Sequence, residues 1–331
     1  MQQKDTQQFY EAHQTLLHWY KQHGRHTLPW RNTQNLYHVY LSEIMLQQTQ
    51  VSRVRDEYYP QFLEKFPTLD ALRDAPLDDV FAAWSGLGYY RRAKNLHSCA
   101  KECVGVLPQS ETELLELSGI GQYTASAICC FGLGQSIPVV DTNIARVLKR
   151  YFSLLNQTDK TLWQYATKFV NETDPRHHNL ALMDLGSLIC LPKNPKCDAC
   201  PLKETCLGKI EPELYTQTKK KEYIAMELFF GVLIKEGKIA LQLSDDNMYK
   251  DMLVLPKVEP LEDKLIAKFK HSYTKYRLDV HLYEVEEICG EILWIDLDKF
   301  DLAPISSLTK KAKLHLSKKY LFMERHLAQR Q

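Results

Sequence analysis

Hydrophobic positions along the chain follow one period up to about residue 207 and another after about residue 222. The apolar residues within 16–20 and 36–44 recur every three or four positions, which is typical of amphipathic helices. No segment before Cys206 alternates with a period of two, so this part is predicted to be all-α. Proline and glycine separate its further helical segments, which are predicted at 53–65, 76–85, 90–104, 111–117, 122–131, 142–151, 160–171 and 178–189.

The second part of the chain alternates with a period of two. Residues 228–234 and 238–243 are predicted strands that flank a hairpin turn at Glu236-Gly237. Further strands are predicted at 277–284 and 291–295, and a helix at 306–331. The sequence therefore predicts a helical domain over residues 1–207, a lysine-rich linker over 208–222 and an α+β domain over 223–331.

Charge and composition narrow the functional classes only slightly. The 331 residues include 42 Lys and Arg against 41 Asp and Glu, so any nucleic-acid-binding surface must be a local patch. No run approaches the roughly 20 apolar residues of a membrane helix, and the N-terminal residues lack the apolar core of a signal peptide. We expect a cytoplasmic protein (nucleoid-associated in a bacterium), a monomer, with no membrane partner.

Four of the nine cysteines lie together in a C-x6-C-x2-C-x5-C pattern: Cys190, Cys197, Cys200 and Cys206. Four thiolates within seventeen residues can hold one metal centre. Structural zinc sites usually have two short cysteine pairs, and here only Cys197 and Cys200 form one. The spacing favours an iron–sulfur cluster and leaves zinc as the alternative. Lys193 and Lys196 in the same loop could face a phosphate.

The segment 117–125, LSGIGQYTA, predicts a helix, a tight turn at Gly119 and Gly121, and a second helix. Backbone amides at such a turn can bind an anion such as a DNA phosphate, although ordinary helix–helix turns also contain glycine. Asp141 lies twenty residues beyond and precedes the helical run 144–149. It is predicted to cap that helix, whose dipole would keep its carboxylate ionised.

Glu43 shares a helical face with Val39 and Leu46. Desolvation on an apolar face raises the pKa of a carboxyl, so Glu43 is predicted to stay protonated near neutrality. The alternative is a boundary glutamate paired with an arginine such as Arg31. The pKa values of Glu43 and Asp141 are therefore expected to shift in opposite directions, and such a pair, one acid and one anion, suits cleavage of a glycosidic bond. If that bond is in DNA, the base must first be flipped out of the stack.

These residues identify a family resemblance over about residues 8–207. The helical domain resembles the helix-hairpin-helix, Gly/Pro…Asp DNA glycosylases with an iron–sulfur loop, and within them the MutY-type adenine DNA glycosylases. The C-terminal domain resembles, more faintly, the Nudix-like domain of such enzymes, but it has no Nudix hydrolase box. The matching stretches are LPWR (28–31), LSEIMLQQTQV (41–51), WSGLGYYRRAKNLH (84–97), LSGIGQYTASAI (117–128), VVDTNIARVL (139–148), MDLGSLIC (183–190) and the cysteine loop (190–206).

The resemblance implies a role for each catalytic position. Glu43 would protonate the adenine ring nitrogen, and Asp141 would stabilise the sugar cation with support from Asn143. Tyr123 stands where the lyase branch has its Schiff-base lysine.

The resemblance also implies the binding residues. Trp30, Arg31 and Leu46 would line the adenine pocket, and Gln48 and Tyr89 would be wedges in the duplex. The four cysteines would hold a 4Fe–4S cluster.

Three positions depart from the family pattern. Thr142 replaces a glycine, and Leu180 replaces a glutamine or glutamate in the base pocket. The Phe-Ser-His element that senses 8-oxoguanine is here Tyr273-Thr274-Lys275. We expect Thr274 to contribute specificity and Lys275 to contribute affinity.

The sequence predicts a monofunctional DNA glycosylase that hydrolyses the N-glycosidic bond of adenine opposite 8-oxoguanine or guanine in double-stranded DNA. A mismatch-specific thymine glycosylase stays open because of Leu180. An endonuclease III-like lyase would need a lysine at Tyr123, and a non-catalytic DNA-binding iron–sulfur protein would need neither Glu43 nor Asp141.

Overall fold

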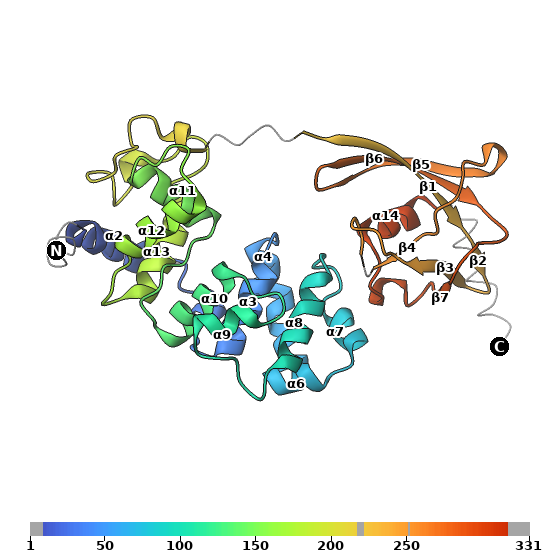
Figure 1. The fold of residues 1–331 in the computed structure, drawn as a ribbon, viewed down its shortest axis with the longest axis horizontal. Coiled ribbons are helices and arrows are strands. Elements are labelled where there is room, and N and C mark those ends of the chain that lie inside the picture. Colours follow the sequence, from blue (N-terminus) through green and yellow to red (C-terminus); the bar gives the residue numbers. More distant parts are fainter. Residues whose placement is uncertain (1–8, 217–221, 251, 317–331) are drawn as a thin grey trace. The chain divides into compact units, whose positions relative to one another are not determined.

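We describe the protein from a computed structural model, in which residues 9–216, 222–250 and 252–316 are described. The described residues form two compact units (Figure 1). Unit 1 comes from residues 1–74 and 95–219, and unit 2 from residues 75–94 and 220–331. Residues 75–94 thus group with unit 2, and the domain boundaries at 207 and 223 stay a prediction.

Unit 1 is helical throughout its described residues, as the periodicity predicts. The predicted helices agree with the observed ones to within a few residues at each end. The predicted helix at 53–65 is built from two helices joined by the π-helical turn Val54–Tyr58. The helices are α2 (Tyr10–His23), α3 (Leu36–Leu46), α4 (Val51–Arg53), α5 (Tyr59–Lys65), α6 (Leu69–Asp74), α8 (Arg91–Glu102), α9 (Glu111–Glu116), α10 (Gln122–Ala127), α11 (Thr142–Tyr151), α12 (Asp159–Phe169) and α13 (Pro175–Leu188). The first turn of α8, residues 91–94, groups with unit 2.

Polar side chains begin the helices that carry the site. The Asn35 side chain accepts hydrogen bonds from two backbone amides at the start of α3. Asp141 caps α11 and Asp174 caps α13, where Pro175 occupies the first helical position. Apolar side chains of α2, α3, α11, α12 and α13 form one core that includes Leu16, Val39, Val147, Phe169 and Leu185. This core fixes the relative positions of the helices that carry the candidate site.

Unit 2 contains two sheets. In the first, β6 (Tyr276–Glu284) lies between β1 (Ile224–Val232), to which it is parallel, and β5 (Leu265–Tyr273), to which it is antiparallel. In the second, β3 (Lys238–Leu243) pairs with β2 (Ile234–Lys235), β4 (Leu253–Val254) and β7 (Leu293–Asp296). The helices of this unit are α7 (Leu77–Ala83) and α14 (Ser307–His315).

The α+β class predicted for the C-terminal part is confirmed, with differences in detail. Glu236 and Gly237 form the predicted turn, both with positive φ. Strands β4 and β5 were not predicted. The predicted helix at 306–331 is α14 over its first part, and residues 317–331 lie outside the described residues.

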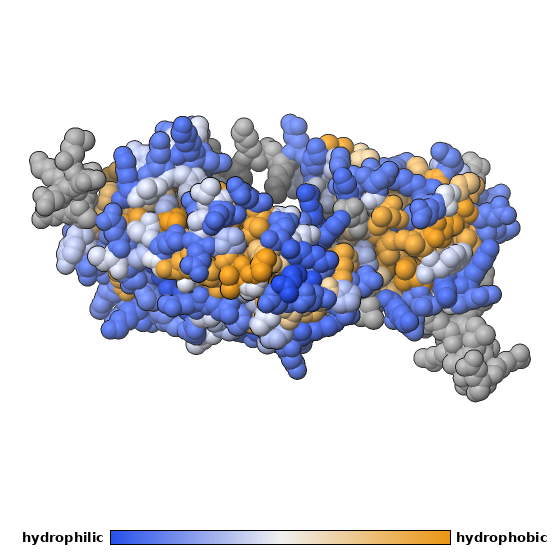
Figure 2. All heavy atoms as spheres, turned by 60° about the horizontal axis from the view of Figure 1, so that its bottom comes forward, coloured by the Kyte–Doolittle hydropathy of each residue, from blue (hydrophilic) through white to orange (hydrophobic). Residues whose placement is uncertain are grey.

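Figure 2 shows one face of the molecule, on which hydrophilic side chains cover most of the surface and apolar atoms gather in separate areas. Val104, Val106 and Ile210 are among the most exposed apolar side chains. No helix within the described ranges is long and apolar enough to cross a membrane.

Candidate active site

A cavity of about 780 Å³ lies within unit 1 and brings the predicted chemistry together. Its walls come from α3, α10, α13, the start of α11 and the turn Pro29–Arg31 (η1). The position that departs from the family pattern, Leu180, also lines it and is 5% exposed. The predicted site residues in its wall are Trp30, Arg31, Glu43, Leu46, Gln48, Tyr123, Asp141 and Asn143.

Glu43 is a buried carboxyl in the cavity wall. It is 6% exposed, and its Oε2 accepts a hydrogen bond from the Tyr123 hydroxyl at 2.5 Å. Burial raises the pKa of Glu43 to about 7, against the lowering effect of the Tyr123 hydrogen bond. The charge of Asp141 raises this pKa further and the charge of Arg31 lowers it. Burial thus favours the protonated form of Glu43 near neutral pH, as its apolar helical face predicts.

Asp141 caps α11 as predicted. One carboxylate oxygen accepts a hydrogen bond from the Ile144 amide at 2.6 Å, and the other accepts one from Asn143 Nδ2 at 2.8 Å. Burial nevertheless raises the pKa of Asp141, while these hydrogen bonds lower it. The expectation that the two carboxyls shift in opposite directions is therefore wrong, because the cavity desolvates both. Asp141 differs from Glu43 in having two N–H donors, which favour its anion.

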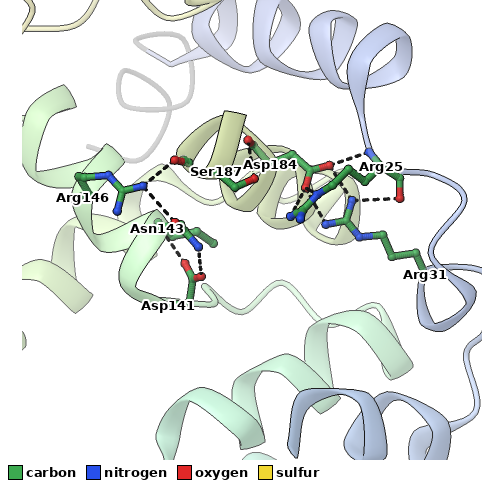
Figure 3. A network of polar contacts seen from close by, with 9 residues as sticks. Arg25, Arg31, Asp141, Asn143, Arg146, Asp184 and Ser187 are labelled. Carbon is green, nitrogen blue, oxygen red and sulfur yellow. Dashed lines mark hydrogen bonds and ion pairs between the residues drawn. The ribbon is translucent and has the colours of Figure 1, made fainter. Parts of the chain in front are cut away.

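A chain of hydrogen bonds continues behind Asp141 (Figure 3). Arg146 Nη2 donates to Asn143 Oδ1 at 3.0 Å and to the Gly186 backbone oxygen at 2.5 Å. Arg146 Nε donates to the Cys190 backbone oxygen at 2.7 Å. Arg146 thus connects Asn143, which donates a hydrogen bond to Asp141, with Cys190, the first residue of the cysteine loop. Arg146 was not among the predicted site residues.

A second polar cluster joins two arginines to one carboxylate from α13 (Figure 3). Arg31 Nη1 and Nη2 donate to the two oxygens of Asp184 at 2.6 and 2.8 Å. Arg25 donates to the same carboxylate through its backbone amide at 2.8 Å and through Nε at 2.6 Å. Arg31 therefore pairs with Asp184, and the alternative that it pairs with Glu43 is wrong. Asp184 was missed, although a lone aspartate within the apolar run ALMDLG was a usable signal.

The glycine turn between α9 and α10 has the predicted form. Gly119 has a φ of 78°, and a β-carbon there would lie 2.5 Å from the Asn95 side chain. Gly121 precedes α10 with open space around the position where a β-carbon would stand. The neighbouring Ser118 donates through its amide and hydroxyl to the carboxylate of Glu102, at 3.0 and 2.5 Å. Position 119 therefore requires glycine, and the hydrogen bonds from Ser118 to Glu102 attach the turn to α8.

Three predicted recognition residues have a left-handed backbone that side chains other than glycine rarely adopt. The φ angles are 56° at Gln48, 49° at Tyr89 and 49° at Thr274. Gln48 is exposed at the cavity, and Tyr89, in unit 2, is 49% exposed. Thr274 and Lys275 form the turn between β5 and β6. Strain of about 1–3 kcal/mol at such positions is characteristic of functional sites.

The four cysteines of the loop line one small cavity together with Arg150. Arg150 is 2% exposed and lies behind the loop, with Nη1 at 3.2 Å from Cys190 Sγ and at 2.7 Å from the Leu191 backbone oxygen. A shared cavity with four sulfur donors and a buried cation fits an anionic iron–sulfur cluster. Among the described residues, no group of three or more His, Cys, Asp or Glu is arranged to hold a single metal ion. Lys193 and Lys196 are exposed in this loop.

Comparisons with known proteins agree with this geometry. The family model of the HhH-GPD superfamily of base excision DNA repair proteins matches residues 41–185. The adenine DNA glycosylase of Buchnera aphidicola subsp. Baizongia pistaciae is 43% identical over 236 residues, which cover 68% of this chain and 67% of that protein. The adenine DNA glycosylase of the subspecies Schizaphis graminum is 33% identical over 300 residues, which cover 82% of this chain and 86% of that protein. The human adenine DNA glycosylase is 38% identical over 213 residues, which cover 59% of this chain and 39% of that protein.

Two solved structures resemble about three fifths of this chain. A thermostable thymine-DNA glycosylase matches with a TM-score of 0.57 and 29% identity, over 63% of this chain and 98% of that one. A non-covalent endonuclease III–DNA complex matches with a TM-score of 0.54, over 62% of this chain and 97% of that one. Because it is only 19% identical, it supports the fold alone. The sequence relatives above are 33–43% identical to this chain, and the Schizaphis graminum protein covers 82% of it. The chain therefore belongs to the adenine DNA glycosylases, within the HhH-GPD superfamily of base excision DNA repair proteins.

Proposed function

We propose that this protein removes adenine from double-stranded DNA by hydrolysing its N-glycosidic bond, when the adenine is mispaired with 8-oxoguanine or guanine. The observation that carries the proposal is a buried carboxyl, Glu43, whose pKa is about 7 and which shares a cavity with Asp141. A general acid works best when its pKa lies near the working pH. The cavity of about 780 Å³ is large enough for a flipped purine nucleoside.

Glu43 delivers the proton. In its neutral form it protonates a ring nitrogen of the flipped adenine, which turns the base into a better leaving group. The Tyr123 hydroxyl, hydrogen-bonded to Oε2, holds the carboxyl in one orientation so that the other oxygen is available to the base. The apolar wall formed by Leu46 and Leu180 excludes water from this proton transfer.

Asp141 stabilises the charge that develops on the sugar. As the glycosidic bond breaks, the sugar becomes positively charged and oxocarbenium-like, and a nearby carboxylate lowers the energy of that state. The amide of Ile144 and the side chain of Asn143 favour the Asp141 anion. Arg146 fixes Asn143 through a hydrogen bond of 3.0 Å. Water then adds to C1′ of the sugar cation and gives a proton to the Glu43 carboxylate, which restores the acid. Position 123 is a tyrosine, which has no amine to form a Schiff base, so we assign hydrolysis without strand cleavage.

DNA binding is shared among several parts of the chain. Gly119 and Gly121 present backbone amides to a phosphate, and Gln48 and Tyr89 enter the duplex as wedges; their left-handed backbone supports this role. Cys190, Cys197, Cys200 and Cys206 would hold a 4Fe–4S cluster, which would order the loop that carries Lys193 and Lys196. We assign no catalytic step to the cluster.

The second domain, residues 223–331 after the linker 208–222, would be Nudix-like and would recognise the opposite base. Thr274 lies in the turn between β5 and β6 at a backbone angle costly for a β-branched residue. A β-branched residue at such a costly angle supports a specific contact by its hydroxyl, with Lys275 adding affinity for phosphate. We place the enzyme, as a monomer, with DNA in the cytoplasm or nucleoid.

A duplex panel tests this function. The protein is incubated with duplexes that contain A:8-oxoguanine, A:G, T:G or A:T pairs, and abasic sites are then cleaved with alkali. We expect product from the first two duplexes only, and none without alkali. Product from T:G alone would establish the thymine glycosylase instead, and strand cleavage without alkali would establish a lyase. Glu43→Gln is the matched control for a contaminating glycosylase.

A further inference from the structure

Asp184 is the most completely buried charged group in the described part of the cavity region, yet it contacts no predicted catalytic residue. Its side chain is 0% exposed, and it receives both Arg31 and Arg25. The Arg31 side chain is 4% exposed and the Arg25 side chain 29%. A buried carboxylate is costly unless it is fully paired, and here two guanidinium groups and one backbone amide pair it.

The location of this cluster gives it an electrostatic consequence. Arg31 and Arg25 both line the cavity that contains Glu43. Two cations share one anion, so the cluster has an excess positive charge beside the acid that must keep its proton. An unopposed cation in a desolvated cavity favours the ionised form of a neighbouring carboxyl. Asp184 opposes that effect.

We propose that Asp184 is a positioning residue that holds Arg31 in the wall of the base pocket and offsets its positive charge at Glu43. The proposal rests on the proposed function for its catalytic meaning, but the charge compensation can be measured without DNA. The Arg31 side chain thereby lines the base pocket in one fixed orientation, while Glu43 stays protonated. Without Asp184, the charge of Arg31 would lower the pKa of Glu43, and Glu43 would lose the proton that the reaction needs.

Several other groups surround Glu43. Tyr123 from α10, Asp141 from the start of α11 and Arg31 from η1 act most strongly on its pKa. Of these only Arg31 lowers the pKa through its charge, and only its charge is compensated by Asp184. The remaining titratable groups lie on elements packed against α3 or in the cavity wall. They are the cavity residues Arg25 and Arg176, the tyrosines Tyr58 and Tyr59, the exposed charges Arg55, Asp56, Glu57, Glu64 and Lys65, and the buried thiols Cys129 and Cys130, whose pKa values burial raises.

The direct test is a titration of Glu43 in the free full-length protein. The 13C shift of its carboxyl carbon is followed against pH in labelled protein and assigned by its absence in Glu43→Gln. Asp184→Asn keeps the shape of the side chain but removes its charge, so Glu43 should titrate about 0.5–1 pH unit lower, the effect of one charge across a pocket at an effective dielectric constant of about 20. Asp184→Glu should restore the wild-type titration.

Two further variants separate charge from structure. Arg31→Met removes the cation itself and should move the Glu43 titration to higher pH; it decides the question if Asp184→Asn does not fold. Arg25→Met leaves the Arg31–Asp184 pair intact and should not move the titration to lower pH. An unmoved titration in Asp184→Asn, or in Arg31→Met where the former does not fold, overturns the proposal.

The pH profile of adenine release then connects the cluster to catalysis. In single turnover, the fall of the rate on the alkaline side should move to lower pH in Asp184→Asn by the same shift as the titration. A rate reduced equally at every pH would show that Asp184 acts only through structure and would overturn the proposal. If the wild-type protein releases no adenine, the proposed function fails, whereas the titration still decides the charge compensation.

Discussion

Replacing Glu43 with glutamine should abolish adenine release while strengthening the fold at alkaline pH. The amide has nearly the same shape and can still accept the Tyr123 hydrogen bond, but it has no proton to deliver. General acid catalysis contributes typically about 100- to 10,000-fold. Single-turnover release by Glu43→Gln should therefore fall by at least about 100-fold, with mismatch DNA still bound.

The gain in stability follows from the pKa of Glu43. Burial raises this pKa from 4.5 to about 7, so between these values the folded state holds a proton that the unfolded state has lost. The contribution of Glu43 to the free energy of unfolding is therefore greatest below pH 4.5 and declines as the pH rises through 7. A shift of about 2.5 pH units corresponds to about 3 kcal/mol. Glutamine cannot ionise, so the variant should be more stable than wild type by up to this amount at pH 8.

Two assays check these opposite effects. Adenine release is measured in single turnover at saturating enzyme, and urea unfolding of both proteins is measured at pH 5 and pH 8. Near-normal release by the variant would refute the role of Glu43 as acid. A stability difference that is the same at both pH values would refute the burial argument on which the pKa rests.

Four further outcomes are expected. Borohydride should trap little covalent complex with abasic DNA, because Tyr123 offers no amine; efficient trapping would place the enzyme among the lyases. Anaerobically purified protein should contain about four irons, and Cys200→Ser should weaken DNA binding more than it slows release from the bound complex; stoichiometric zinc without iron would contradict this. Burial lowers the pKa of His178 to about 3, so the free energy of unfolding should decline as the pH falls from 6.5, by no more than about 1.4 kcal/mol per pH unit. His178→Phe should reduce this decline in urea unfolding, and an unchanged decline would contradict the assignment. Tyr273→Ala combined with Thr274→Ala should reduce the preference for A:8-oxoguanine over A:G in binding assays, and an unchanged preference would exclude a recognition role for this turn.

Local signals predicted much of the helical unit. Apolar periodicity gives the helices, and capping residues such as Asp141 mark where they begin. The burial of Glu43 followed from its helical face alone. Strand β5 alternates between less exposed and exposed residues from Ala267 to Tyr273, but it was missed because its inward positions include the small Ala267 and the polar His271 rather than a run of large apolar residues.

Long-range contacts explain what the sequence did not predict. Arg31 and Asp184 are 153 residues apart in the chain, and no local pattern pairs them. The upward pKa shift of Asp141 depends on a cavity that several helices build together, so its capping position alone suggested the wrong direction. The role of Arg146 likewise appears only when α11 packs against α13 and the cysteine loop.

The pH dependence of adenine release by the wild-type enzyme tests the central claim most directly. The rate of the chemical step is measured in single turnover on an A:8-oxoguanine duplex from pH 5.5 to pH 9. If the buried Glu43 is the acid, the rate should decline above about pH 7, by about tenfold per pH unit, in step with the loss of its proton. A rate that is constant or rises from pH 7 to pH 9 would contradict the account.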